Sequence, residues 1–350
     1  MPQIASMAAY ALADPCPDDW VSLAQNESAF APSPAAVSAA RAIADETALY
    51  PDPDWTALRA AIAQVHGVAG AHILCGAGSM ELIGALIRAF AGPGDAVLGS
   101  AHGYLFAQTA SQQVGAAYHC VPEYNYSVDT DALAGAVTPQ TRIVFLCNPG
   151  NPTGTRISNG QIVALRAQLP ETVLLVVDQA YAEFDDQDPT AIFDLVDSLN
   201  TVVLRTFSKA YGLAGARVGW GLFPAAIARD VRKLLNPNNV SGISQAMACA
   251  AMLDQAYMRH VVTETAKRRM DFASQLEISG FTCPESHTNF VLIPFSDASA
   301  ADRADARLRD HGLLLRGMAG YGLPHCLRAT IGQAGDMNRV AGLLTKGPDA

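Results

Sequence analysis

The chain has 350 residues, half of them hydrophobic, and a formal net charge of −10 at pH 7. This length can bury a large core and accommodates one large domain with a smaller one, whereas the negative charge argues against nucleic acid and anionic membranes as partners. No apolar stretch is long enough to span a bilayer, and seven scattered cysteines without a CxxC pair indicate reduced thiols in a cytoplasmic protein.

Residues 1–40 are predicted to form an arm that packs against one of the domains. The segment has no basic region in front of its short Ala-rich run, so we do not interpret it as a signal peptide. It contains "SAFAPSPAA" and has no strong hydrophobic period.

Residues 41–242 are predicted to form the large domain. Four nearly continuous apolar runs, "DAVLGS", "TRIVFLCNP", "TVLLVVDQA" and "TVVLRTFSK", are typical of strands buried on both faces. Helical patterns such as "ELIGALIRAFAG" and "SNGQIVALRAQL" separate them, and Ser158 is a plausible N-cap of the second. Alternating strands and helices predict an α/β fold with a mainly parallel sheet between helices.

Residues 243–350 are predicted to form a smaller α+β domain. It begins with a long linking helix at about 243–278, and "FVLIPF", the helical "ADRADARLRDHG", "GLLLRGM" and "CLRATIG" follow.

Lys209 is one of only four lysines, and it follows an apolar strand that ends in the small polar residues Thr206 and Ser208. At the carboxyl end of a strand in an α/β sheet, its side chain would point into the crevice where ligands bind. A deprotonated lysine amine there can form a Schiff base with an aldehyde. A surface lysine is the alternative.

Asp178 ends a second apolar strand in "VVDQAYAEF", three residues before Tyr181. A carboxylate at such a place needs a cationic partner, and a protonated pyridine nitrogen would serve. Asn151, in the "NPGNPTG" turn, could offer its amide to a phenolic oxygen.

Small residues open the predicted helix in "GAGSMELIGALIRAF". The free N–H groups of Gly78, Ser79 and Met80 would make a phosphate cradle, and Arg217 could add a charged contact. Each motif alone is weak, but together they supply an aldehyde acceptor, a pyridinium partner, a phenolate donor and a phosphate site.

With these motifs in this order, the chain resembles the fold-type I, pyridoxal-phosphate (PLP)-dependent aminotransferases of class I/II. Within this family it is most similar to the histidinol-phosphate aminotransferase group, from "NES" at 26–28 to "LRATIG" at 327–332. The resemblance implies a large domain with a mainly parallel sheet, a smaller α+β domain, PLP as cofactor and a homodimer with a shared active site.

The resemblance also implies roles for single residues. Lys209 would carry the cofactor and shuttle the proton, Asp178 would pair with the pyridine nitrogen, and Tyr181 would donate to the phenolic oxygen. Further cofactor contacts would come from Asn151, Tyr104, Gly78, Ser79, Met80, Thr206, Ser208, Arg217 and, from the partner subunit, Tyr50. Substrate contacts would come from Arg328, which would clamp a carboxylate, and from Arg316, Tyr10 and Asn26.

The chain departs from the family pattern at several positions. Ser28 and Gly150 stand where asparagine is common, and Met80 stands where an acidic residue is frequent. The arm around Tyr10 lacks a Pro-Gly-basic motif, and no Lys, Arg or His precedes Arg41. Because the family's arm lies near the substrate, the donor stays open between histidinol phosphate, the best guess, and aromatic amino acids.

The sequence therefore predicts a cytoplasmic transaminase that moves an amino group from a small-molecule donor to a 2-oxo acid, 2-oxoglutarate being the expected acceptor, by a ping-pong mechanism. A PLP-dependent decarboxylase related to threonine-phosphate decarboxylase is the alternative. A DNA-binding regulator is disfavoured by the short, non-basic arm, and a dehydrogenase by the absence of a G-x-G-x-x-G turn. His287 and His325 lie in apolar surroundings, which favours packing over metal binding, and we expect no metal.

Overall fold

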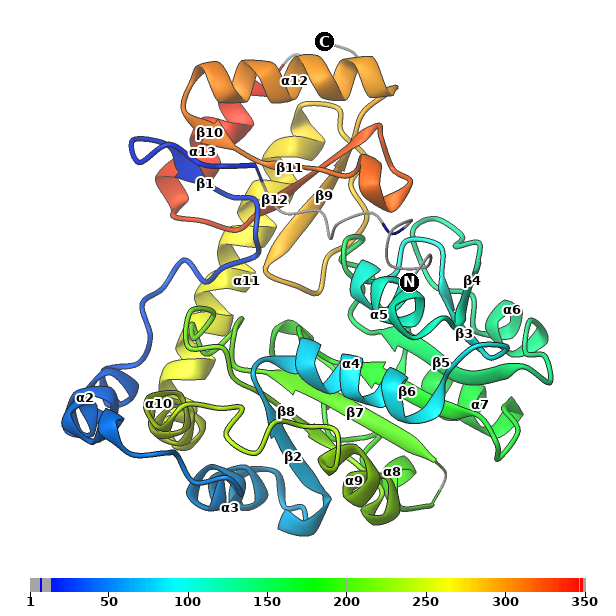
Figure 1. Ribbon diagram of the computed structural model, residues 1–350. Coiled ribbons are helices and arrows are strands. Elements are labelled where there is room, and N and C mark those ends of the chain that lie inside the picture. Colours follow the sequence, from blue (N-terminus) through cyan, green and yellow to red (C-terminus); the bar gives the residue numbers. More distant parts are fainter. Residues whose placement is uncertain (1–6, 8–13, 199, 346, 349–350) are drawn as a thin grey trace.

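A mixed, mostly parallel sheet of seven strands forms the centre of the computed structural model, which describes residues 7, 14–198, 200–345 and 347–348 (Figure 1). The strand order is β2-β8-β7-β6-β5-β3-β4, in which only β8 runs antiparallel to its neighbours. The strands are β2 (Ile73–Gly76), β3 (Ala96–Ser100), β4 (Ala117–Val121), β5 (Thr141–Cys147), β6 (Leu174–Asp178), β7 (Thr201–Thr206) and β8 (Gly219–Leu222). The α/β fold predicted from the alternating pattern is confirmed.

Strands β6 and β7 are buried along their whole length, as parallel strands covered on both faces must be. Helices cover the sheet, and Figure 1 shows α4 lying across its strands. The helices of this part are α2 (Pro34–Ala42), α3 (Thr56–His66), α4 (Ser79–Phe90), α5 (Leu105–Val114), α6 (Thr130–Gly135), α7 (Asn159–Gln168), α8 (Asp194–Ser198), α9 (Ala225–Arg232) and α10 (Gly242–Leu253), with the 3-10 turns η1 (Ala44–Ala48), η2 (Gly70–His72) and η3 (Ala182–Phe184).

The N-terminus of α7 confirms the predicted cap. The Ser158 hydroxyl accepts from the Gln161 N–H at 3.2 Å, and the Gln161 side chain accepts from the Ser158 N–H at 2.9 Å. This reciprocal capping box satisfies two N–H groups that the helix itself cannot.

A smaller lobe has its own hydrophobic core and an antiparallel sheet in the order β11-β12-β9. Its strands are β9 (Phe290–Pro294), β11 (Arg316–Gly317) and β12 (Cys326–Thr330), and its helices are α11 (Gln255–Ile278), α12 (Ala298–Asp310), α13 (Ala334–Leu343) and the turn η4 (Ala319–Tyr321). The helix expected at about 243–278 is two helices, because Asp254 leaves the helical conformation and caps α11 by accepting from the Tyr257 N–H.

The segment between β1 (Val21–Ser22) and α2 connects the two lobes. Strand β1 pairs with β10 (Leu313–Leu314) in the smaller lobe, and α2 packs against α10 beside the large sheet. Figure 1 shows this segment descending alongside α11. The chain therefore crosses between the lobes once here and again through α11.

Candidate active site

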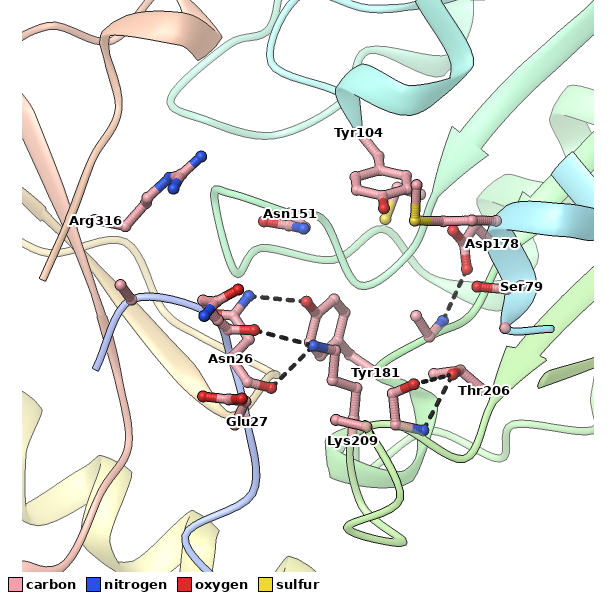
Figure 2. A pocket seen from close by; sticks show the side chains of 18 of the residues that line it. Asn26, Glu27, Ser79, Tyr104, Asn151, Asp178, Tyr181, Thr206, Lys209 and Arg316 are labelled. Atoms are coloured by element: carbon pink, nitrogen blue, oxygen red, sulfur yellow. Dashed lines mark hydrogen bonds between the residues drawn. The ribbon is translucent and has the colours of Figure 1, made fainter. Parts of the chain in front are cut away.

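A cavity of about 400 Å³ lies at the carboxyl ends of the large sheet's strands and is closed on its other side by the smaller lobe. Figure 2 shows Asp178 and Ser79 at one end of it and Arg316 at the other. The predicted site residues that line it are Asn26, Gly78, Ser79, Met80, Tyr104, Asn151, Asp178, Tyr181, Thr206, Ser208, Lys209, Arg217, Arg316 and Arg328.

Lys209 extends from the loop after β7 into this cavity. Its Nζ donates to the backbone carbonyls of Asn26 at 2.9 Å and Gln25 at 3.2 Å. Desolvation, with the nearby Arg328 charge, lowers the pKa of the Lys209 amine to about 7. A substantial fraction of the amine is therefore neutral at physiological pH, as a nucleophile or proton acceptor must be.

Asp178 is the last residue of β6, and only 2% of its surface is exposed. Its carboxylate accepts from the Ala180 N–H at 3.1 Å, and burial raises the pKa of this carboxyl to about 7. A buried carboxylate is stabilised when a cation is placed against it. The cavity therefore suits a ligand that brings a positive charge to Asp178.

Hydrogen bonds determine how the polar side chains between Asp178 and the smaller lobe are oriented. Arg328 can only donate, so its contact of 2.5 Å places the Asn151 Oδ1 toward the guanidinium and leaves the amide nitrogen on the Tyr104 side (Figure 2). Tyr181 accepts from the Asn26 Nδ2 at 2.8 Å. Arg328, which lines the cavity, also donates to the Ala24 carbonyl at 2.9 Å.

The start of α4 forms the predicted anion cradle, with one difference. Gly78 adopts a φ of 80°, and a Cβ there would lie 2.7 Å from the Arg217 Nη2, so only glycine lets the guanidinium approach. The Gly78 N–H is not free, because it donates to the Gly76 carbonyl at 2.7 Å. The N–H groups of Ser79 and Met80 have no carbonyl within the helix to accept from them, so they can still donate to an anion bound at this end.

Two hydroxyls complete the cradle. Thr206 and Ser208 lie 3.0 Å apart through their side-chain oxygens, and the Ser208 N–H donates to the Thr206 Oγ1 at 3.1 Å. Arg217 is held by its own contact of 2.8 Å with the Ala214 carbonyl. This set of donors fits a phosphate group, and a phosphate at the cradle leaves Asp178 and Lys209 for the rest of the same ligand.

Comparison with known proteins decides the family. The family model for aminotransferase class I and II matches residues 18–344. The chain belongs to the class I and II aminotransferases.

Several relatives of this aminotransferase are histidinol-phosphate aminotransferases. The histidinol-phosphate aminotransferase of Jannaschia sp. (strain CCS1) is 42% identical over 328 residues, which cover 93% of this chain and 91% of the relative. That of Rhodospirillum rubrum is 43% identical over 332 residues, covering 93% and 90%. The crystal structure of histidinol-phosphate aminotransferase from Sinorhizobium meliloti in complex with pyridoxal-5'-phosphate superposes with a TM-score of 0.91 at 32% identity, over 99% of this chain and 96% of that one.

These findings make the protein a PLP-dependent transaminase, as the motifs predicted. The cavity fits this cofactor, because it combines a phosphate cradle, a buried carboxylate and a lysine of lowered pKa. Among the described residues, no helix of the aminotransferase is long and apolar enough to cross a membrane.

Several residues that line the cavity had no motif in the sequence. Cys147 ends β5, Glu27 lies beside Asn26 in the arm, and Tyr321 comes from η4. Cys147 could have been found as the residue at a strand end, next to "NP". Glu27 and Tyr321 reach the cavity only because the fold brings two segments that are far apart in the sequence to the same cavity.

Tyr50 is a predicted site residue of this aminotransferase that does not line the cavity. Tyr50 lies on the surface with 88% of its area exposed, next to Leu49, which is 74% exposed. Tyr10 lies outside the described residues. The roles predicted for both stay predictions.

The histidines singled out in the sequence are engaged by other side chains. His325 contacts the Tyr126 hydroxyl through Nε2 at 3.2 Å. His287 lies with Asp185 and Asp186 in the one group of the described residues that has the spacing of metal ligands. Arg156 pairs with both carboxylates of that group and offsets part of their negative charge.

Proposed function

We propose that this aminotransferase takes its amino group from histidinol phosphate and passes it to 2-oxoglutarate by a ping-pong mechanism. The observation that carries the donor is the identity of 42% over 93% of the chain with a histidinol-phosphate aminotransferase. The cavity supports it, because two arginines line it: Arg316 stands at the end away from Asp178 (Figure 2), and Arg328 contacts Asn151. An anionic donor and an anionic acceptor can use them in turn.

The cofactor would be held at its two charged ends. Ser79, Met80, Thr206, Ser208 and Arg217 would bind its phosphate, with Gly78 allowing the close approach. Asp178 would keep the pyridine nitrogen protonated, because burial makes an unpaired carboxylate costly there. Tyr104 would stack on the ring, and Tyr181 and Asn151 would donate to its phenolic oxygen.

When bound, PLP supplies an electron sink that makes the substrate's Cα–H acidic. Lys209 would take that proton on its Nζ and return it to the neighbouring carbon of the cofactor. Its lowered pKa of about 7 suits both directions of transfer. Arg328 would orient the substrate by a bidentate contact, while Arg316 would add a second anion contact and Asn26 and Tyr10 would border the substrate.

The assembly proposed is a homodimer whose two active sites each use Tyr50 of the other subunit. The exposure of Tyr50 and Leu49 supports this, since two adjacent large apolar residues at a chain's surface are typical of an interface. We also propose that the dimer is cytoplasmic, in keeping with seven scattered cysteines that form no CxxC pair.

The donor is tested by bleaching of the bound cofactor's visible band, without any acceptor present. Histidinol phosphate, phenylalanine, tyrosine, leucine and glutamate are added one at a time to the purified enzyme. We expect histidinol phosphate to bleach the band fastest and 2-oxoglutarate to restore it. A faster aromatic donor would overturn the proposed substrate, and carbon dioxide release without restoration would favour the decarboxylase.

A further inference from the structure

Asn26 is bonded to both lobes through every polar group that it has. It is 1% exposed and adopts a φ of 54°. Its side chain contacts Tyr181 and Thr330, and its backbone N–H donates to the Thr330 Oγ1 at 2.9 Å. Its carbonyl accepts from Lys209 at 2.9 Å and from the Asn289 Nδ2 at 3.1 Å. A single arm residue thus contacts two side chains of the large lobe and two of the smaller one.

The Thr330 hydroxyl determines which way the Asn26 amide faces. Because a backbone N–H can only donate, the Thr330 Oγ1 must accept from Asn26, and its own hydrogen is free to donate. The acceptor within reach is the Asn26 Oδ1 at 3.2 Å. The amide oxygen therefore faces Thr330, and the amide nitrogen faces Tyr181 (Figure 2).

The direction of the amide fixes the direction of the Tyr181 hydroxyl. The Asn26 Nδ2 can only donate, so at 2.8 Å the Tyr181 oxygen accepts and its hydrogen points elsewhere. Burial raises the pKa of the Tyr181 phenol, so this hydrogen is retained across the physiological range. Tyr181 lines the cavity, and its O–H is thereby left to donate to a ligand there.

We propose that Thr330 is a positioning residue whose hydroxyl orients the Asn26 amide and, through it, turns the Tyr181 O–H toward the cofactor. The inference rests on the proposed contact between Tyr181 and the cofactor's phenolic oxygen. It needs no direct contact of Thr330 with the cavity, and Thr330 is not among the residues that line it.

The position of Thr330 in β12 gives the relay a second consequence. Alternate residues of a strand point to the same face, so Thr330 and Arg328 face the same side of the small sheet. Arg328 contacts Asn151, whereas Thr330 contacts Asn26. One strand of the smaller lobe thus orders both side chains, Asn151 and Tyr181, that are proposed to bind the phenolic oxygen.

The test compares Thr330→Val, which keeps the shape and removes the hydroxyl, with Thr330→Ser, which keeps the hydroxyl. Thr288→Val is the matched control, since Thr288 is a buried threonine of the same lobe whose hydroxyl contacts Phe290 and Ser286 instead. The readout is the pH midpoint of the visible absorbance of the bound cofactor, recorded without substrate. It is therefore independent of which donor the enzyme uses.

When the phenolic oxygen loses a hydrogen-bond donor, it keeps more negative charge. The proton next to this oxygen on the cofactor is then bound more tightly, so it is lost at a higher pH. We expect Thr330→Val to raise the midpoint by about half a pH unit or more. Thr330→Ser and Thr288→Val should keep the wild-type midpoint. We also expect kcat of Thr330→Val to fall about threefold or more, with KM for the donor nearly unchanged.

A double variant shows whether the effect passes through Tyr181. Thr330→Val should shift the midpoint no further once Tyr181→Phe has removed the O–H, whereas fully additive shifts would overturn the relay. A wild-type midpoint in cofactor-loaded Thr330→Val would overturn it as well. If Tyr181→Phe alone leaves the midpoint unchanged, the proposed role of Tyr181 fails rather than that of Thr330. Should Thr330→Val not fold, Thr330→Ala replaces it, because it also removes the hydroxyl without adding a charge and should raise the midpoint in the same way.

Discussion

Burial shifts the pKa values of Lys209 and Asp178 in opposite directions, and both shifts suit the roles proposed for these residues. Burial disfavours the charged form of each, so the pKa of the amine falls to about 7 and that of the carboxyl rises to about 7. The lysine is then available as a base, while the carboxylate becomes stable only when a cation faces it. The low polarity of the buried site therefore suits both the proposed base, Lys209, and the proposed partner of a cation, Asp178.

Asp178 should make the apoenzyme less stable as the pH rises. Its folded-state pKa of about 7 lies above the ordinary value of 3.8, so protonation stabilises the fold. That contribution is complete below about pH 4 and is lost as the pH rises through about 7. Asp178→Asn removes this dependence, so we expect the variant's apoenzyme to gain stability relative to wild type by about 2 kcal/mol between pH 5 and pH 8.

Melting of both apoenzymes across this range measures the difference. A constant gap between the variant and wild type would show that the buried carboxyl does not titrate as described. In the holoenzyme we expect Asp178→Asn to lower both stability and rate instead, because it removes the proposed partner of the pyridine nitrogen.

The sequence predicted the site residues that stand in a recognisable local motif. It did not predict those whose role depends on a partner far away in the sequence. Asp178 ends a strand, and Lys209 and Asn151 each follow one, so their place at one edge of the sheet could be predicted. The contact of Thr330 with Asn26 joins residues 304 positions apart. No local pattern encodes such a pair, because it exists only once the arm has crossed between the lobes.

At the scale of elements, the start of α4 depends on glycine at position 78. Gly78→Ala would force a side chain into a φ of 80° and place its Cβ 2.7 Å from the Arg217 Nη2. We expect a loss of about 1 kcal/mol in stability and about tenfold weaker PLP binding, because Arg217 must move out of the cradle. Thermal melts and cofactor titration measure the two effects.

Gly92→Ala is the matched control for this change. Gly92 follows the same helix, and a Cβ there would have no atom within 4 Å. This variant should bind PLP as tightly as wild type. Equal losses in both variants would mean that the cradle does not depend on the close approach of Arg217.

The elements themselves were predictable to different degrees. Strands β5, β6 and β7 are continuous apolar runs, and a run buried on both faces leaves few alternatives. The break between α10 and α11 was missed, although an aspartate that can cap a helix stands at position 254. The two-residue strands β1 and β10 carry no periodic signal, since pairing between distant segments creates them.

At the scale of the whole molecule, the cavity belongs to neither lobe alone. Lys209 and Asp178 come from the large sheet, Arg316 and Arg328 from the small one, and Asn26 from the arm between them. A change in the angle between the lobes would therefore separate the proposed cofactor contacts from the proposed anion contacts. The predicted domain boundaries at 40 and 242 stay predictions, but the two hydrophobic cores are separate.

If each active site uses residues of both subunits, two inactive variants should restore activity when they form a mixed dimer. Lys209→Ala should abolish transamination, and Tyr50→Ala should weaken cofactor binding enough to lower activity severely at limiting PLP. If each site combines Lys209 of one subunit with Tyr50 of the other, a mixed dimer of the two variants contains one wild-type site and one that lacks both residues. Random pairing makes half of the dimers mixed, so co-expression should restore about a quarter of the wild-type activity.

Activity of the co-expressed pair, measured at limiting PLP against each variant alone, decides the arrangement. If Tyr50 serves its own subunit, the mixed dimer holds two defective sites and no activity returns. Lys233→Ala paired with Tyr50→Ala is the control, because Lys233 is an exposed lysine that contacts only Asp230 among the described side chains. That pair should reach about half of the wild-type activity whether the sites are shared or separate, since half of all sites are then served by the Tyr50→Ala chain. The restored activity of the first pair is therefore the result that identifies a shared site.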